Sequence, residues 1–146
     1  MEALESREFP QMTEKKSPPL HVLVVDDEPL IRWSLAETLK EQGHDVVEAG
    51  DGHGAEMAVR NASEPFDVVL MDYRLPDSND LLLLASIRRL SPRAQVILMT
   101  AFGRPEIVRG ALEVGAFRVI NKPFEMRDMA DLVAHAHAAG LDTETH

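Results

Sequence analysis

The sequence predicts an α/β fold in which a parallel β-sheet is covered by helices on both faces. Short runs rich in β-branched residues alternate five times with segments whose apolar residues have helical spacing. Three of the five runs are apolar throughout, which is typical of central strands buried on both faces. A length of 146 residues suits one domain with a hydrophobic core of its own.

The five predicted strands differ in their expected position in the sheet. The first, third and fourth are the apolar runs, whereas the second is short and flanked by polar residues, as an edge strand should be. This favours the order 2-1-3-4-5, a doubly wound, flavodoxin-like (βα)5 sheet with its topological switch between the first and third strands. The strands are expected at residues 21–25, 45–48, 67–71, 95–99 and 117–121.

The five predicted helices are bounded by local signals. Gly43 and Gly115 follow apolar helical patterns and are expected to end them, and Gly140 is expected to end the last helix. Pro105 suits the first turn of a helix, and Pro92 stops the helix before it. The helices are expected at residues 29–42, 54–62, 80–90, 105–114 and 126–139.

Composition separates the domain from its ends. Residues 1–19 hold three of the nine prolines, few aliphatic residues and nearly balanced charges. Such a segment cannot bury enough apolar surface to offset its ordering entropy, so we expect a flexible N-terminal tail. The domain is expected at residues 20–140, and residues 141–146 are expected to form a C-terminal tail.

Charge and composition exclude several classes of function. The chain has 15 Lys and Arg against 25 Asp and Glu, a net charge of −10, so direct nucleic-acid binding is not expected. Cysteine is absent, which excludes disulfides, thiolate metal sites and cysteine nucleophiles. No apolar run approaches the roughly 20 residues of a membrane helix, and the first residues lack the apolar segment of a signal peptide. We expect a cytoplasmic protein without membrane contact.

Polar residues gather where the predicted strands end. Ligands of open α/β sheets bind at the carboxyl ends of the strands. Two carboxylates 4 Å apart repel by about 4 kcal/mol at an effective dielectric constant of 20, so a cation must neutralise such a cluster. Lys122 can offset one charge, and the remaining oxygens suit Mg²⁺. The residues at these ends are Asp26, Asp27, Glu28, Asp72, Thr100, Asn121 and Lys122.

These side chains suit phosphoryl transfer. Each aspartate alone would be interpreted as a helix cap or a solvated loop residue, but their combination with Thr100 and Lys122 favours a site. Asp72 is the best candidate nucleophile, because it follows a central strand and faces the Asp26–Asp27 pair. Mg²⁺ and Lys122 would hold two phosphoryl oxygens, and Thr100 the third. No glycine-rich loop follows the first strand, so a nucleotide or flavin is not expected.

Four motifs, in order and with matching spacing over about residues 20–140, resemble those of response-regulator receiver domains of two-component systems. Two further segments, Ile31-Arg32-Trp33 and Gly115-Ala116-Phe117, resemble most the receivers of nitrogen-regulatory sigma-54-dependent activators. The four motifs are Val24-Val25-Asp26-Asp27-Glu28, Asp72-Tyr73-Arg74-Leu75-Pro76-Asp77, Met99-Thr100-Ala101 and Asn121-Lys122-Pro123-Phe124.

The resemblance implies a phosphoacceptor signalling domain that promotes only its own phosphorylation and dephosphorylation. Asp72 would accept the phosphoryl group from a sensor histidine kinase or a phosphotransfer protein. Mg²⁺ would bind Asp27, Asp72 and the backbone carbonyl of Arg74, with Asp26 holding a metal-bound water. Thr100, Ala101 and Lys122 would bind the phosphate. The last two helices and the last strand would then contact a downstream protein target or form a phosphorylation-dependent dimer.

The sequence departs from the receiver pattern at two positions. Receivers usually carry Tyr or Phe three residues before the lysine, where this chain has Val119. Valine is short and stiff about χ1, so the loop after Thr100 should carry the switch instead, and Phe102 should move. In the resting state Phe102 is expected to pack in the core. Asp80 stands where many receivers have Gly, which predicts altered loop geometry.

Two other functions remain open at this point. A Mg²⁺-dependent phosphatase of the haloacid dehalogenase type would use Asp26 as nucleophile and Glu28 as its second acid, although that class usually has Asp there, a larger core and a cap. A pseudo-receiver would bind partners without phosphorylation, and the intact set of Asp27, Asp72, Thr100 and Lys122 argues against it. We expect no output domain within these 146 residues, so the output is expected to be a protein contact or to lie in a larger activator.

Two expectations concern residues outside the site. The six histidines are scattered along the sequence and are expected on the surface. Residues 81–84 are all leucine, which is apolar around a whole helix turn, so at least one of the four leucines is expected to be exposed.

Overall fold

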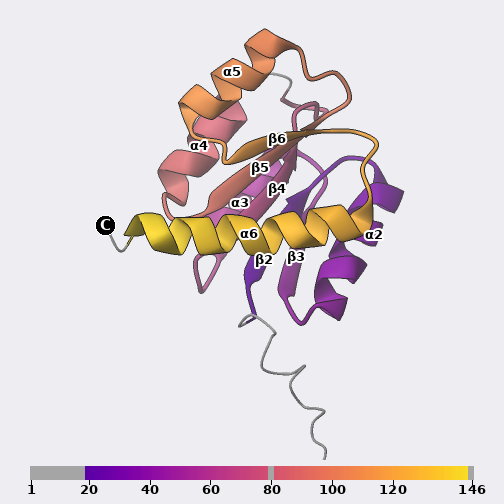
Figure 1. The fold of residues 1–146 in the computed structure, drawn as a ribbon, viewed down its shortest axis with the longest axis vertical. Helices are drawn as coiled ribbons and strands as arrows, with labels where there is room; N and C mark the ends of the chain where they lie inside the picture. The colour runs from indigo at the N-terminus through magenta and orange to yellow at the C-terminus, as the bar shows by residue number, and fades with distance from the viewer. Residues whose placement is uncertain (1–18, 79–80, 145–146) are drawn as a thin grey trace, which may run out of the picture.

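The computed structural model describes residues 19–78 and 81–144 and contains one five-stranded parallel sheet (Figure 1). The strand order, β3-β2-β4-β5-β6, is the predicted 2-1-3-4-5 arrangement. The strands are β2 (His21–Val25), β3 (Asp45–Ala49), β4 (Val68–Asp72), β5 (Gln95–Thr100) and β6 (Arg118–Asn121). The helices are α2 (Pro29–Glu41), α3 (Gly52–Asn61), α4 (Leu82–Leu90), α5 (Pro105–Val114) and α6 (Met126–Glu144). No described helix is long and apolar enough to cross a membrane.

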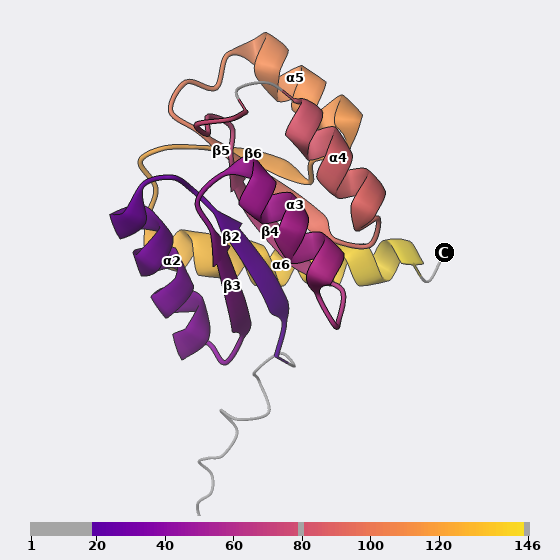
Figure 2. The same ribbon diagram turned by 180° about the vertical axis from the view of Figure 1, so that it is seen from behind.

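Two hydrophobic clusters lie on opposite faces of the sheet. Helices α2 and α6 cover one face, and α6 crosses in front of the sheet in Figure 1. Helices α3, α4 and α5 cover the other face, which Figure 2 shows from behind. All five residues of β4 are buried, and burial on both faces of the sheet explains why the first four, residues 68–71, are apolar. Helix α5 buries one residue, Ala111, and four of its other residues are half-buried.

Glycine marks the end of two helices but not of the third. Gly43 and Gly115 have φ values of 95° and 123°, a left-handed conformation that glycine adopts without a Cβ penalty, and both predicted helix ends are confirmed. Helix α6 instead continues through Gly140 to Glu144, so the predicted C-terminal tail is helical over residues 141–144. A Cβ on Gly140 would lie 3.0 Å from Nε2 of Gln95, so this glycine allows a close approach between the helix and β5. The predicted tail of residues 1–19, apart from Pro19, lies outside the described residues.

Other boundaries shift by one or two residues for local reasons. Helix α3 begins at Gly52, before the predicted residue 54, because the Asp51 side chain caps it and accepts a hydrogen bond from the Gly54 N–H at 2.7 Å. Helix α4 begins at Leu82, and the altered loop predicted at Asp80 falls outside the described residues. Leu82 is 74% exposed, which confirms an exposed leucine in the run 81–84.

One histidine is buried, contrary to the expectation that all six lie on the surface. The Nδ1 atom of His44 accepts a hydrogen bond from the Leu20 N–H at 3.0 Å, which ties the start of β2 to the α2–β3 turn. Burial lowers the pKa of His44; the negative charge of Asp67 opposes this shift, and His137 adds to it. The imidazole is therefore held in its neutral form.

The free energy of unfolding should fall as the pH is lowered from 7 to 5. Because the folded-state pKa of His44 lies below 6.5, the unfolded chain binds the proton first, and the stability contributed by neutral His44 is lost as the pH falls through the folded-state pKa. His44→Asn keeps an acceptor near Nδ1 but cannot take up the proton. Urea denaturation at a series of pH values should show a weaker pH dependence for this variant, and an unchanged profile would contradict the assignment to His44.

Candidate functional site

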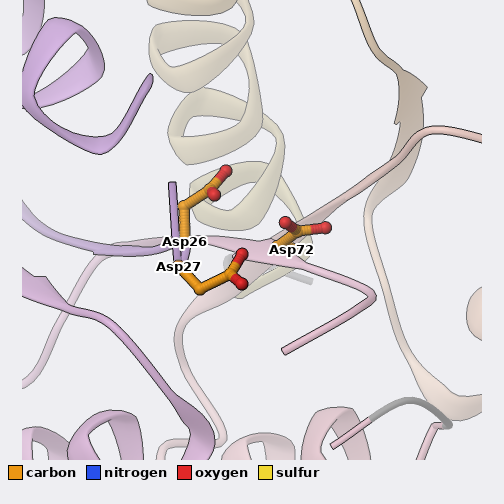
Figure 3. Close-up of side chains that lie close together, drawn as sticks. All are labelled: Asp26, Asp27 and Asp72. Carbon is orange, nitrogen blue, oxygen red and sulfur yellow. The ribbon is translucent and has the colours of Figure 1, made fainter. Parts of the chain in front are cut away.

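Three aspartates meet at the carboxyl edge of the sheet (Figure 3). Asp26 and Asp27 follow β2, and Asp72 ends the neighbouring strand β4. One carboxylate oxygen of each lies within 4.8 Å of the other two. Asp26 and Asp72 are buried, whereas Asp27 is exposed, so the cluster opens to solvent on one side. The predicted meeting of these side chains is confirmed, and their oxygens form a donor set that fits a hard divalent cation.

Lys122 joins the cluster from the loop after β6. Its ammonium nitrogen lies 2.9 Å from Oδ2 of Asp26 and 3.0 Å from Oδ2 of Asp72. It also lies 2.9 Å from Oε1 of Glu28, a contact that the sequence did not predict. Three carboxylates from two distant parts of the sequence thus converge on one cation at the carboxyl edge of the sheet.

Burial and charge oppose each other in this cluster. Burial alone would lower the pKa of the Lys122 ammonium, but its hydrogen bonds to Asp26, Glu28 and Asp72 outweigh burial and raise it. Burial raises the pKa of Asp72, and the neighbouring Asp26 charge adds to this, against the opposing hydrogen bond from Lys122. The lysine therefore stays charged, and one lysine does not compensate the buried carboxylates fully.

The backbone around Asp26 is fixed by Arg32, which the sequence indicated only as part of a segment that resembles other receivers. Arg32 donates from Nη1 to the Asp26 carbonyl at 2.8 Å, and its Nε donates to Glu48 at 3.2 Å. The Asp26 N–H donates to the Ala49 carbonyl at 3.1 Å, and Asp26 Oδ1 accepts from the Glu28 N–H at 2.9 Å. These bonds orient the Asp26 carboxylate toward Lys122.

The loop after β4 is tied to helix α3 by Asp77. Its carboxylate accepts hydrogen bonds from the Gly52 N–H at 2.7 Å and the His53 N–H at 3.0 Å. These backbone bonds, that from Gly52 first, lower the pKa of Asp77. The exposed carboxylate thus caps a helix 25 residues away in sequence and fixes the loop that carries Arg74. No local pattern in the sequence indicates this contact.

Replacing Asp77 with Ala should lower the free energy of unfolding by about 1 kcal/mol, the usual cost of a lost helix cap. The reason is that two N–H groups at the start of α3 lose their acceptor. Urea denaturation measures the difference, and Asp45→Ala, at an exposed aspartate without such a role, serves as the comparison. Equal stabilities of the two variants would contradict the cap.

Thr100 ends β5 and lies under a loop that projects into solvent. The Thr100 side chain is buried, and its hydroxyl oxygen accepts a hydrogen bond from the Phe102 N–H at 3.2 Å. Phe102 is 72% exposed, so the expectation that it packs in the core is wrong. Val119 is half-buried against the cluster beneath α3, α4 and α5.

A cleft of about 670 Å³ opens over the cluster. Most predicted site residues line it, whereas Asp26 and Thr100 are buried and do not. Its walls combine acidic and basic groups with an apolar side formed by Ile31, Phe124 and Met126. The predicted site residues in the lining are Asp27, Asp72, Arg74, Ala101 and Lys122.

Comparison with known families decides how this arrangement is interpreted. The sequence model described as the response regulator receiver domain matches residues 22–134, most of the chain. The chain belongs to the response regulator receiver family. This confirms the resemblance read from the four motifs, and it places the receiver domain in a family of signalling proteins of two-component systems.

Relatives of this receiver domain include longer regulators. It is 37% identical over 114 residues to the transcriptional regulatory protein PdtaR of Mycobacterium tuberculosis, covering 76% of this chain and 53% of PdtaR. It is 40% identical over 119 residues to the response regulator protein FleR of Pseudomonas aeruginosa, covering 82% of this chain and 24% of FleR. The chain thus spans from about a quarter to about half the length of these relatives.

Solved structures agree with the fold. A CheY-like receiver domain protein from Methanospirillum hungatei superposes with a TM-score of 0.80 at 26% identity, covering 86% of this chain and 99% of that one. The beryllofluoride-activated receiver domain dimer of NtrC4 gives 0.75 at 30% identity, covering 82% and 98%. The similarity to NtrC4 agrees with the predicted likeness to receivers of nitrogen-regulatory activators.

Proposed function

We propose that Asp72 of this receiver domain accepts a phosphoryl group from a sensor histidine kinase or a phosphotransfer protein. The observation that carries this proposal is the Lys122 ammonium, which is bonded to both Asp26 and Asp72 at the base of an open acidic cleft. A fixed cation beside a nucleophilic carboxylate stabilises charge on an incoming phosphoryl group. Asp26 is a poor nucleophile here, because it is fully buried and does not line the cleft, whereas Asp72 does.

The residues in and around the cleft have different roles in the proposed transfer. An Asp72 oxygen forms the new P–O bond while the P–N bond of the donor phosphohistidine breaks, and the imidazole leaves with the bonding pair and takes up a proton. Asp27, Asp72 and the Arg74 carbonyl would hold Mg²⁺, with Asp26 acting through a bound water. Mg²⁺ would neutralise phosphoryl charge. Lys122, the Thr100 hydroxyl and the backbone N–H of Ala101 would hold the phosphoryl oxygens.

Incubation with Mg²⁺ and acetyl phosphate, followed by intact-mass measurement, tests this function. One phosphoryl adduct that persists for minutes is the expected result. Continuous hydrolysis of acetyl phosphate without an adduct would instead indicate the phosphatase with Asp26 as nucleophile, and no reaction would indicate a pseudo-receiver.

The output is proposed to be a protein contact on the face formed by α5, β6 and α6. A downstream protein target or a second copy of the phosphorylated domain would bind there, in the cytoplasm and without direct contact to nucleic acid or membrane. The backbone supports a path to this face. The Lys122 N–H donates to the Thr100 carbonyl at 2.8 Å, and Gly103 lies so close to the Asn121 side chain that a Cβ would collide with it. A displacement of Lys122 or Thr100 would therefore move the loop before α5.

Activation should move the loop between Thr100 and Pro105 together with α5. A phosphoryl oxygen would draw the Thr100 hydroxyl away from the Phe102 N–H by a bond worth up to about 3 kcal/mol. NMR spectra of methyl and aromatic groups, with and without beryllofluoride and Mg²⁺, should show large shifts at Phe102 and α5 and small ones at Val119. Lys122→Ala should bind Mg²⁺ without these shifts. Changes confined to Val119, with Phe102 and α5 silent, would contradict this account.

A further inference from the structure

The Lys122 ammonium has no unused donor in this structure. An ammonium group carries three N–H bonds. Their acceptors are Oδ2 of Asp26, Oε1 of Glu28 and Oδ2 of Asp72, all at 2.9–3.0 Å. A phosphoryl oxygen that binds Lys122 must therefore displace one of these three carboxylates.

The three carboxylates differ in what their displacement would cost. Asp26 is fully buried, so its carboxylate would lose a partner without gaining water. Asp72 is 8% exposed and is itself the residue that carries the phosphoryl group. The Glu28 side chain is 57% exposed, so its carboxylate is hydrated as soon as it leaves Lys122. The Glu28 carboxylate is the one that can leave at least cost.

The position of Glu28 allows its side chain to move alone. Its backbone N–H is held by Asp26, and its carbonyl accepts the first hydrogen bond of α2, from Arg32. The side chain lines the same cleft as Asp72 and Lys122, on the route by which a phosphoryl donor must approach. A rotation about its side-chain bonds therefore clears Lys122 and leaves the backbone in place.

We propose that the Glu28 carboxylate occupies, in the unphosphorylated protein, the place on Lys122 that a phosphoryl oxygen takes, and so competes with phosphorylation. This inference rests on the proposed phosphorylation of Asp72. Glu28 acts as an internal anion that keeps Lys122 paired and lowers the affinity of the site for phosphoryl groups. When Asp72 is phosphorylated, Glu28 is released into water at the mouth of the cleft.

Beryllofluoride, a phosphoryl mimic, tests the competition directly. At saturating Mg²⁺, Glu28→Gln should bind beryllofluoride about two- to five-fold more tightly than the wild type, as expected for the loss of an exposed ion pair. The difference should shrink as salt is raised, because exposed charges are screened. Glu41→Gln removes the same charge from the exposed C-terminal end of α2 and should match the wild type. NMR titration gives the dissociation constants, and a separate Mg²⁺ titration fixes the saturating concentration for each variant.

The outcomes separate this inference from the proposed function. Equal or weaker beryllofluoride binding by Glu28→Gln would overturn the inference, as would an equal gain in Glu28→Gln and Glu41→Gln, which would indicate net charge rather than competition for Lys122. A wild-type chain that binds Mg²⁺ but neither beryllofluoride nor phosphate would instead overturn the proposed function. A thermal melt of each variant confirms that the fold is retained, since glutamine keeps the size and the backbone contacts of Glu28.

Discussion

In the presence of Mg²⁺ and acetyl phosphate, Asp72→Asn is expected to gain no phosphoryl group, whereas the wild-type chain gains one. A carboxamide has no anionic oxygen with which to attack phosphorus, so the loss of labelling should be complete rather than partial. The fold should be retained, because the two side chains are nearly equal in size and the amide oxygen can still accept the hydrogen bond from Lys122. Intact mass and circular dichroism measure the two properties.

The same experiment shows where the nucleophile lies if the assignment fails. Asp45→Asn serves as the comparison, because it removes a carboxylate at the opposite end of the sheet and should be labelled as the wild type is. Robust labelling of Asp72→Asn at another single residue would move the nucleophile to Asp26 and favour phosphatase chemistry.

Addition of Mg²⁺ should raise the melting temperature of the wild-type protein by roughly 5–10 °C. At a Mg²⁺ concentration 100 times the dissociation constant, binding to the native state alone stabilises a protein by about 2.7 kcal/mol, which corresponds to such a shift for a domain of this size. The physical reason is the carboxylate cluster, in which Lys122 is the one bonded cation among the described residues. Thermal melts with Mg²⁺ and with a chelator measure the shift.

Asp27→Asn should abolish most of this Mg²⁺ response, because the exposed Asp27 carboxylate faces the open side of the cluster. Asp45→Asn removes one negative charge from the opposite end of the sheet and should respond to Mg²⁺ as the wild type does. An unchanged response in Asp27→Asn would remove this residue from the metal site.

The sequence predicts the fold well where a local pattern has one physical cause. The central strands can be predicted because burial on both faces of the sheet favours an apolar run, as in residues 68–71 of β4. Gly43 and Gly115 mark helix ends because both adopt left-handed backbone conformations. Gly140 wrongly predicts a helix end. Its small size is needed for a tertiary contact, because it makes room for Gln95 of β5, and helix α6 continues past it.

In the candidate site, too, some contacts can be predicted from the sequence and others depend on tertiary packing. The meeting of Asp26, Asp27, Asp72 and Lys122 is predictable, because all follow parallel strands and such ends share one edge of the sheet. The contacts of the site with its surroundings are not. The bond from Asp77 to helix α3 and the position of Glu28 on Lys122 depend on how loops pack in three dimensions, and no residue spacing encodes them.

Helix α5 has a thermodynamic consequence for signalling. Helix α5 buries one residue, Ala111, whereas α4 buries four, so less packing opposes a displacement of α5 than of α4. Two positions of α5 that differ by a few kcal/mol would both be populated, and a single new bond at Thr100 is enough to change their ratio several-fold. The less stable position would then hold roughly 0.1–10% of the molecules. Small substitutions on α5 are therefore expected to change this ratio without touching the cleft.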